Sequence, residues 1–234
     1  MRVHRLHTHF QVVANAHAAP LAADLDDEVE NLWLAEMKSR EGLFNGQLLS
    51  VDSFEPERIA GTFVEYRRLV AQRLQPRLFA SLRIRPLAVS GIVVAPDGLL
   101  FGRRSLSMAS SGGLWELAPS GGLDPETSLR NGIVDYMAQF YAESAEEVGI
   151  ERSRFRVARP ILIIEGDEPS TFDIVIHAHV DLSIAEVADR FGQVRGEYSD
   201  FKIVPESAMR EFIDESRPQI DPTTLAALEA CDYI

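Results

Sequence analysis

The chain is poor in cysteine and has no long apolar stretch, and both features restrict what it can be. Its single cysteine, Cys231, excludes an internal disulfide and a zinc site built from several cysteines, and it suits a reducing compartment. No run of 18 apolar residues is present, and Met1 to Gln11 carries arginine and histidine where a secretory signal would be apolar. We therefore expect a cytoplasmic protein without a signal peptide or a membrane span.

Positive charge is also scarce. The 234 residues include 23 Lys and Arg against 36 Asp and Glu, which gives a net charge of −13. Residues 1–85 hold equal numbers of the two kinds, so residues 86–234 carry the whole excess of negative charge. A polyanion such as DNA or RNA would be repelled unless a basic stripe compensated, and no such stripe is evident. The charge pattern favours a small-molecule partner screened by metal and argues against a nucleic-acid partner.

The hydrophobic pattern predicts two units. With 46% hydrophobic residues, the chain can bury one good core and a smaller second one. We predict a small N-terminal α/β domain over residues 1–85 and a larger domain over residues 86–234. The predicted fold class is α/β (α+β), with a mixed β-sheet sandwiched between helices in the larger domain.

The larger domain contains a clear hairpin signal. Asp97-Gly98 separates two apolar runs, which predicts strands over residues 87–94 and 99–103. A helix is expected over residues 206–215, where apolar residues repeat at helical spacing. Further strands are expected at residues 114–118, 155–165, 172–180 and 201–204.

The N-terminal unit combines strand-like runs with amphipathic helices. One strand-like run covers residues 3–13, and two more cover residues 47–53 and 58–65. Helices are expected over residues 27–38 and 66–74. These elements are enough for a small α/β unit, although the pattern does not say whether it covers a site or only supports the sheet.

Three glutamates gather in Ala-Glu-Ser-Ala-Glu-Glu-Val-Gly-Ile, residues 142–150. On an α-helix each residue advances about 100°, so Glu143, Glu146 and Glu147 share one face. Such neighbouring carboxylates repel each other unless a cation lies among them, and hard oxygen ligands suit Mg²⁺ or Mn²⁺. Taken alone, the triplet has a simpler interpretation as the solvated face of a helix.

The surrounding sequence favours a metal site. A strand-like segment leads into Pro119-Ser120-Gly121-Gly122, a helix follows, and Gly149 comes just after the helix. This arrangement resembles a Nudix box, whose pattern is G-x5-E-x7-R-E-U-x-E-E-x-G-U, where U is bulky and apolar. Members of that superfamily bind a divalent metal and cleave a diphosphate linked to another moiety. The resemblance implies the Nudix fold and this type of hydrolysis.

The chain departs from the family pattern within the box. Ala142 replaces the arginine that normally precedes the first helix glutamate, Ser144 replaces an apolar residue, and the interval from Gly122 to Glu143 is six residues longer. Six residues inserted within the helix would rotate the glutamates by about 240° net. The extra length must therefore precede the catalytic face, as a longer loop or as an N-terminal extension of the helix.

Local signals favour the extended helix. Asp124-Pro125 has the residue types of a helix N-cap and first turn, and the apolar residues that follow repeat at spacings of three to four. We therefore predict one helix from about Pro125 to Val148. Glu126 is the candidate for the upstream glutamate of the family pattern.

The resemblance also implies catalytic and metal-binding roles. Glu143 and Glu147 would be direct metal ligands, with Glu146 as a further ligand or as a carboxylate that orients metal-bound water. Glu197, just before the strand expected at residues 201–204, would complete the catalytic set. The bound Mg²⁺, or Mn²⁺ in its place, would neutralise diphosphate oxygens and help to generate the attacking hydroxide.

Four further residues are candidates for substrate binding. Gly121 and Gly122 would let the backbone approach metal and phosphate closely, whereas a plain turn is the alternative interpretation. Arg103 and Arg104 could contact substrate phosphates through their planar charge. Because neighbours on a strand face opposite ways, one of the two arginines is expected to point away.

The substrate class is suggested by the N-terminal unit. The order of a helix carrying Trp33, the run Leu43-Phe44-Asn45-Gly46, and Tyr66-Arg67-Arg68 before the hairpin resembles the animal Nudix hydrolases that split UDP-glucose and UDP-galactose. This implies hydrolysis of a nucleoside diphosphate sugar to UMP and the sugar 1-phosphate. Two alternatives stay open: a pyrophosphatase of ADP-ribose, a dinucleotide or coenzyme A, and a catalytically silent nucleotide-binding module, which Ala142 motivates. The base, the sugar and the oligomeric state are left open.

Overall fold

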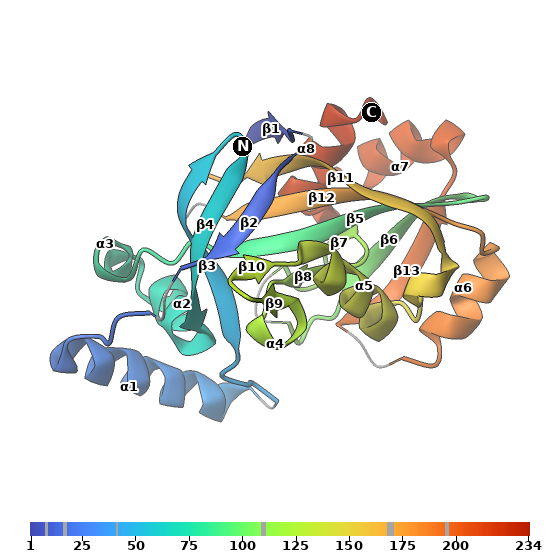
Figure 1. Cartoon of the computed structure of the whole chain (residues 1–234). Helices are drawn as coiled ribbons and strands as arrows, with labels where there is room; N and C mark the ends of the chain where they lie inside the picture. The colour runs from blue at the N-terminus through green and yellow to red at the C-terminus, as the bar shows by residue number, and fades with distance from the viewer. Residues whose placement is uncertain (8, 16–17, 41, 109–110, 168–170, 195–196) are drawn as a thin grey trace.

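The computed structural model describes residues 1–7, 9–15, 18–40, 42–108, 111–167, 171–194 and 197–234. In this part of the chain the strands form two sheets (Figure 1). The larger sheet has eight strands, in the order β1-β11-β12-β5-β6-β13, with β7 paired to β6 and β8 paired to β5. Its strands are β1 (Arg2–Arg5), β5 (Leu87–Ala95), β6 (Gly98–Arg104), β7 (Trp115–Leu117), β8 (Ser120–Gly122), β11 (Phe155–Glu165), β12 (Phe172–Val180) and β13 (Tyr198–Val204).

The large sheet is mixed. Strands β5 and β12 run parallel, and the other neighbours are antiparallel. Strands β5 and β6 pair only beside their turn, where Gly98 has a φ of 140°. Farther along, β5 pairs with β8 and β6 pairs with β7, so the two strands separate and leave room between them. The hairpin predicted on either side of Asp97-Gly98 is confirmed.

The smaller sheet has five strands in the order β3-β4-β2-β10-β9 within the described residues. Its strands are β2 (Gln11–Ala14), β3 (Gln47–Glu55), β4 (Arg58–Glu65), β9 (Leu129–Arg130) and β10 (Ile133–Val134). The run at residues 3–13 is therefore not one strand, because β1 enters the large sheet and β2 the small one. A turn with a hydrogen bond from the Phe10 N–H to the His7 carbonyl separates them.

Helices cover both faces of the large sheet, as the sequence predicts (Figure 1). On one face Phe140 of α5 and Val187 of α6 join a buried cluster that also includes Leu49 of the small sheet. On the other face Phe212 of α7 and Leu228 of α8 form a second cluster. The helices are α1 (Ala23–Ser39), α2 (Tyr66–Leu74), α3 (Phe79–Leu82), α4 (Pro125–Ser128), α5 (Tyr136–Glu147), α6 (Ile184–Phe191), α7 (Met209–Ser216) and α8 (Pro222–Ala230).

Short 3-10 turns complete the connections, and no described helix is long and apolar enough to cross a membrane. These turns are η1 (Pro76–Leu78), η2 (Arg152–Arg154), η3 (Glu206–Ala208) and η4 (Arg217–Gln219). The helix predicted at residues 206–215 is thus η3 followed by α7, and α6 and α8 were not anticipated.

The extended helix predicted from Pro125 to Val148 is wrong. The chain forms α4, then the hairpin β9–β10, and only then α5. Asn131 and Gly132 between β9 and β10 have positive φ angles of 51° and 80°, which is the geometry of an Asn-Gly hairpin turn. The apolar spacing at Leu129 and Ile133 therefore belongs to two short strands. The extra length therefore precedes α5, as α4 and the β9–β10 hairpin.

This hairpin also bears on the predicted boundary near residue 85. Ile133 of β10 pairs with Val13 of β2, so a segment of the predicted larger domain extends the sheet of the N-terminal unit. Conversely, β1 lies at the edge of the large sheet against β11. Two segments thus cross between the predicted units, and the division at residue 85 stays a prediction.

Candidate functional site

Helix α5 presents two of the predicted glutamates inward and one outward. The Asp135 carboxylate caps its first turn by accepting from the Ala138 N–H at 3.0 Å, and Gly149, with a φ of 71°, follows its end. Glu147 is buried, with 4% of its surface exposed. Glu143 is half-buried four residues earlier, whereas Glu146 is exposed. The register counted back from Gly149 therefore brings Glu143 and Glu147 together and leaves Glu146 at the solvent side.

Strand β8 lies directly against these carboxylates. The Ser120 N–H donates to the Glu147 Oε2 at 3.0 Å. A Cβ atom added at Gly121 would lie 2.2 Å from the Glu143 Oε1, so a side chain there would displace this carboxylate. At Gly122 the same atom would meet nothing within 4 Å. The close approach predicted for the glycine pair therefore rests on Gly121, which is in contact with a carboxylate of α5.

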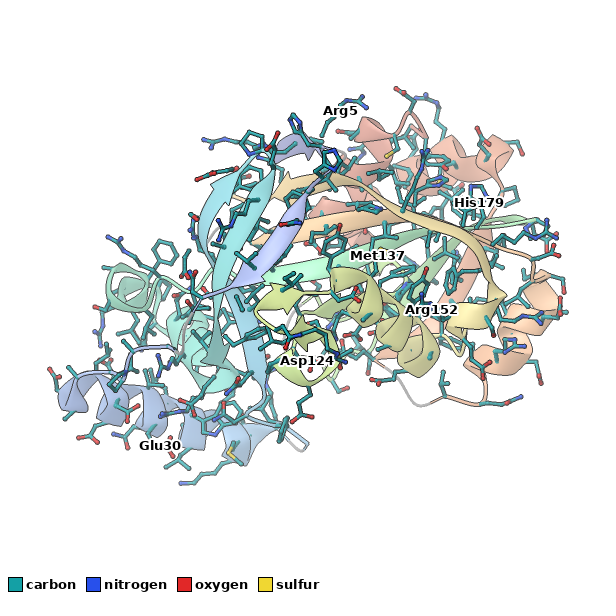
Figure 2. The ribbon with its side chains drawn as sticks, viewed as in Figure 1. Arg5, Glu30, Asp124, Met137, Arg152 and His179 are labelled. Atoms are coloured by element: carbon teal, nitrogen blue, oxygen red, sulfur yellow. The ribbon has the colours of Figure 1, made fainter. Side chains whose placement is uncertain are left out.

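Gln139 fixes the orientation of Glu143. Its Nε2 donates to the Glu143 Oε1 at 2.8 Å, and its Oε1 accepts from the Asp124 N–H at 3.2 Å. Asp124 lies at the start of α4 in front of the large sheet (Figure 2). Gln139 is buried, so its amide is held at both ends. An uncharged donor one turn before Glu143 thus positions this carboxylate in a box that has Ala142 where the family pattern has arginine.

Arg104 links two other carboxylates at the same site. Its guanidinium donates to Glu116 at 2.9 Å and to Glu197 at 2.8 Å. The Tyr198 hydroxyl also donates to Glu116, at 3.0 Å. Glu116 on β7 is buried, whereas 45% of the Glu197 side chain is exposed. The late carboxylate predicted at Glu197 thus lies beside the predicted phosphate contact Arg104, and both lie near the α5 glutamates.

The carboxylates of this group have raised pKa values. Burial raises the pKa of Glu143 to about 7, and the charges of Glu146 and Glu197 add to the effect against the Gln139 hydrogen bond. Burial and the Glu143 charge also raise the pKa of Glu147. For Glu116, burial outweighs the Arg104 charge and raises the pKa to about 7. Burial therefore disfavours the charged form of Glu116, Glu143 and Glu147, even where Arg104 lies alongside.

This donor set fits a divalent cation. Carboxylate oxygens are the ligands that Mg²⁺ and Mn²⁺ prefer, and a cation would stabilise the ionised carboxylates that burial disfavours. Among the described residues no three acidic, His or Cys side chains already converge on one point as metal ligands. The site therefore offers the oxygen chemistry of such a metal without a fully preformed cage, which suits Mg²⁺ because it takes further ligands from water and phosphate.

A pocket of about 410 Å³ opens beside the carboxylates, where β5 and β6 separate. The predicted residues on its wall are Arg104, Gly121, Gly122, Glu143 and Glu197. The Arg103 guanidinium is not on this wall but lies over the Trp115 ring, 5.7 Å from its centroid. One arginine of the pair thus faces the pocket and the other packs on an aromatic side chain.

Sequence reasoning did not single out four charged residues of this pocket, which are Arg73, Glu116, Asp173 and Asp221. Glu116 and Asp173 interrupt apolar strands, which is a signal for a functional carboxylate that could have been used. The Ser90 hydroxyl donates to Asp173 at 2.7 Å, and burial raises the pKa of Asp173 to about 6. Arg73 reaches the same pocket from α2 of the N-terminal unit, and no local pattern indicates that placement.

Comparison with known proteins gives similarity in structure but not in sequence. The chain matches no protein-family model and no curated protein. Among solved structures it is similar to a Nudix hydrolase from Nitrosomonas europaea, with 13% identity, a TM-score of 0.46, and coverage of 62% of this chain and 86% of that chain. It is also similar to the Nudix domain of Shewanella oneidensis NrtR complexed with ADP ribose, with 14% identity, a TM-score of 0.41, and coverage of 62% and 97%.

A third similar structure is that of a protein with two activities. It is a bifunctional NMN adenylyltransferase/ADP ribose pyrophosphatase from Francisella tularensis, complexed with AMP and a Mn ion. It shares 14% identity with this chain at a TM-score of 0.44, and the match covers 72% of this chain and 49% of that chain. These similarities describe the neighbours, and the assignment of a function to this chain depends on its own residues.

Proposed function

We propose that this chain is a Nudix pyrophosphohydrolase that uses Mg²⁺ or Mn²⁺ to hydrolyse the diphosphate bond of a nucleoside diphosphate derivative. The observation that carries the proposal is the contact between α5 and β8. Two inward carboxylates, Glu143 and Glu147, lie against β8, where a side chain at Gly121 would displace the Glu143 carboxylate. A structural acidic helix face would have no need of this close backbone contact or of burial.

The residues suggest a division of work. Glu143 and Glu147 would hold the metal, with Glu197 and the exposed Glu146 as further ligands or as groups that orient water. When bound, such a metal neutralises diphosphate oxygens and lowers the pKa of a water molecule. Gln139 and the Ser120 N–H keep the two inward carboxylates in place. Arg104, which donates to Glu197, would place its positive charge beside a phosphate oxygen.

The reaction consumes one water molecule. Its oxygen forms a bond to one phosphorus, the bond from that phosphorus to the bridging oxygen breaks, and the bridging oxygen leaves on the other phosphate. The protons of the water are shared between the two products or released to solvent. For a UDP-sugar the products would be UMP and the sugar 1-phosphate, and we propose UDP-glucose or UDP-galactose as the substrate on the resemblance of the N-terminal unit.

A substrate panel tests the proposal. UDP-sugars, ADP-ribose, dinucleotides and coenzyme A would be incubated with Mg²⁺ or Mn²⁺, with the wild type, Glu147→Gln and the control Glu215→Gln, which changes an exposed helical glutamate. We expect UDP-sugar cleavage that only Glu147→Gln abolishes. Cleavage of other diphosphates but not UDP-sugars would refute the substrate assignment alone. No turnover, with a nucleotide still raising the melting temperature, would indicate a silent binding module.

A further inference from the structure

Arg73 brings a positive charge to the pocket from outside the box and its sheet. It lies in the last turn of α2 and lines the pocket together with Tyr66 and Leu69 of the same helix and Leu48 of β3. The same pocket is lined by Glu143 and Glu197. The N-terminal unit therefore contributes one cationic and several apolar side chains to a pocket whose other charged lining is mostly acidic.

The Arg73 guanidinium has no hydrogen bond or ion pair within the part of the chain that the structure describes. Its neighbours on the helix differ. Arg67 contacts Asp26, Glu30 and Glu65, and Arg68 lies 3.7 Å from Glu65. Burial at the pocket mouth and the nearby Arg104 charge lower the pKa of Arg73, while the side chain keeps contact with solvent. Arg73 therefore lacks, among the described residues, a carboxylate partner of the kind that Arg67 and Arg68 have.

The backbone beside Arg73 is held firmly. The side chain of the adjacent Gln72 is buried, donating from Nε2 to the Ile84 carbonyl at 2.8 Å and accepting at Oε1 from the Ile84 N–H at 2.8 Å. Ile84 precedes Pro86 and Leu87, which line the same pocket. This double hydrogen bond fixes the end of α2 against the start of β5. The position of Arg73 at the mouth is therefore set by the fold.

We propose that Arg73 binds a phosphate oxygen of the nucleoside diphosphate and so acts as a specificity residue that the N-terminal unit adds to the site. The inference rests on the proposed function and names the residue that receives the phosphate. An anion entering this pocket is repelled by its carboxylates, which belong to Glu116, Glu143, Asp173, Glu197 and Asp221. The planar guanidinium of Arg73 supplies paired N–H donors in the geometry that phosphate accepts.

Binding of inorganic diphosphate, measured by calorimetry in the presence of Mg²⁺, tests this without requiring turnover. The variants are Arg73→Ala and Arg73→Lys, and the matched control is Arg77→Ala, which removes an exposed arginine of the same unit that pairs with Glu28. We expect Arg73→Ala to weaken diphosphate binding by about 10- to 100-fold, as for loss of a charged hydrogen bond. Arg73→Lys should recover part of the loss, and Arg77→Ala should bind as the wild type does.

The outcomes separate this inference from the proposed function. If Arg73→Ala and the wild type bind diphosphate with equal affinity, the role of Arg73 is refuted, even if the wild type hydrolyses a nucleotide. It is also refuted if the wild type does not bind diphosphate. A selective loss in Arg73→Ala would support it even if the panel yields no turnover. Melting temperatures of all three variants should match the wild type, because Arg73 makes no described contact that folding needs. A loss of binding accompanied by a fall in melting temperature would count against a role for Arg73 in phosphate recognition.

Discussion

Two clusters in this protein each place one arginine among several carboxylates, and they differ in burial. In the outer cluster, Arg67 of α2 contacts Asp26, Glu30 and Glu65 at 2.9 to 3.1 Å. The hydrogen bond from Arg67 is the largest of the effects that lower the pKa of Glu65. These carboxylates are partly exposed, with 35 to 47% of each side chain open to solvent, and Arg67 favours the ionised form of Glu65.

In the inner cluster the pKa values move the opposite way. Arg104 contacts Glu116 and Glu197, yet the pKa of Glu116 rises to about 7 because burial outweighs the ion pair. The pKa values of Glu143 and Glu147 are raised as well, and neither residue has a cationic partner in the described part of the chain. Similar residue types thus give an outer cluster in which Arg67 lowers the pKa of Glu65 and an inner cluster in which burial outweighs the charge of Arg104.

Removing one inner carboxylate should have the largest effect and should move activity and stability in opposite directions. We expect Glu147→Gln to lower kcat/KM by more than about 100-fold, since loss of a group behind a metal ligand already costs about 10- to 100-fold. In EDTA the same variant should melt at a higher temperature than the wild type, because a buried like charge is gone.

Hydrolysis assays and thermal melts in EDTA, each with Glu215→Gln as the control, measure the two effects. A lower melting temperature for Glu147→Gln without metal would contradict the idea that excess negative charge strains the pocket. An unchanged kcat/KM would remove Glu147 from the metal site while leaving the electrostatic comparison intact.

Alanine substitutions at Gly121 and Gly122 should show the next largest difference in effect. Gly121→Ala should displace the Glu143 carboxylate, because the new Cβ would lie 2.2 Å from it. That carboxylate is the end of a flexible side chain, so we expect a loss of at least about tenfold in kcat/KM with a stability cost of at most about 1 kcal/mol. Gly122→Ala has open space and should stay within about 0.5 kcal/mol of the wild type. Urea unfolding and kinetics of both variants provide the test. Equal effects would mean that contact with Glu143 is not what requires glycine.

Sequence alone predicted the elements whose signals are local. The hairpin around Asp97-Gly98 has its turn residues between two apolar runs, and the strands Phe155–Glu165 and Phe172–Val180 have the bounds that their apolar content predicts. The register of Glu143 and Glu147 also follows from a local count back from Gly149. Each of these depends on neighbours within one element.

The features that sequence did not predict depend on distant partners. The Asn131-Gly132 turn was read as part of a helix, because β9 and β10 become strands only where Ile133 can pair with Val13 of the small sheet. Arg73 is one of several arginines on a helix, and its position at the pocket follows from how α2 packs against Ile84. Such placements come from tertiary contacts between segments far apart in the chain, so periodicity within a window does not reveal them.

Asp173 allows a smaller test of the inner cluster through pH. Burial raises its folded pKa to about 6, above the ordinary 3.8, so the folded state binds more protons between these values. Its contribution to stability therefore falls as pH rises from about 4 to 6 and stays constant above that. Asp173→Asn keeps an acceptor for Ser90 and removes this dependence.

We expect the stability of Asp173→Asn to gain on that of the wild type by on the order of 1–2 kcal/mol from pH 4 to pH 7. Denaturant unfolding across this range, with the exposed Asp214→Asn as the control, measures the difference. A gap that does not change with pH would show that Asp173 titrates alike in both states, and the pocket would then impose no penalty on that carboxylate.

The outer cluster should give the smallest effect. Glu30, which lies on α1 at the far end of the molecule from α7 (Figure 2), has 47% of its side chain exposed, and Arg67 keeps Asp26 and Glu65 if it is lost. We expect Glu30→Gln to cost about 0.2–1 kcal/mol at low salt, less at high salt, and nothing in kcat/KM. Urea unfolding at two salt concentrations measures the change in stability, and hydrolysis kinetics measure kcat/KM. Because Arg67 and the pocket residue Arg73 lie on the same helix, a fall in kcat/KM would mean that the contact between α1 and α2 sets the shape of the pocket, and the two clusters would then act as one.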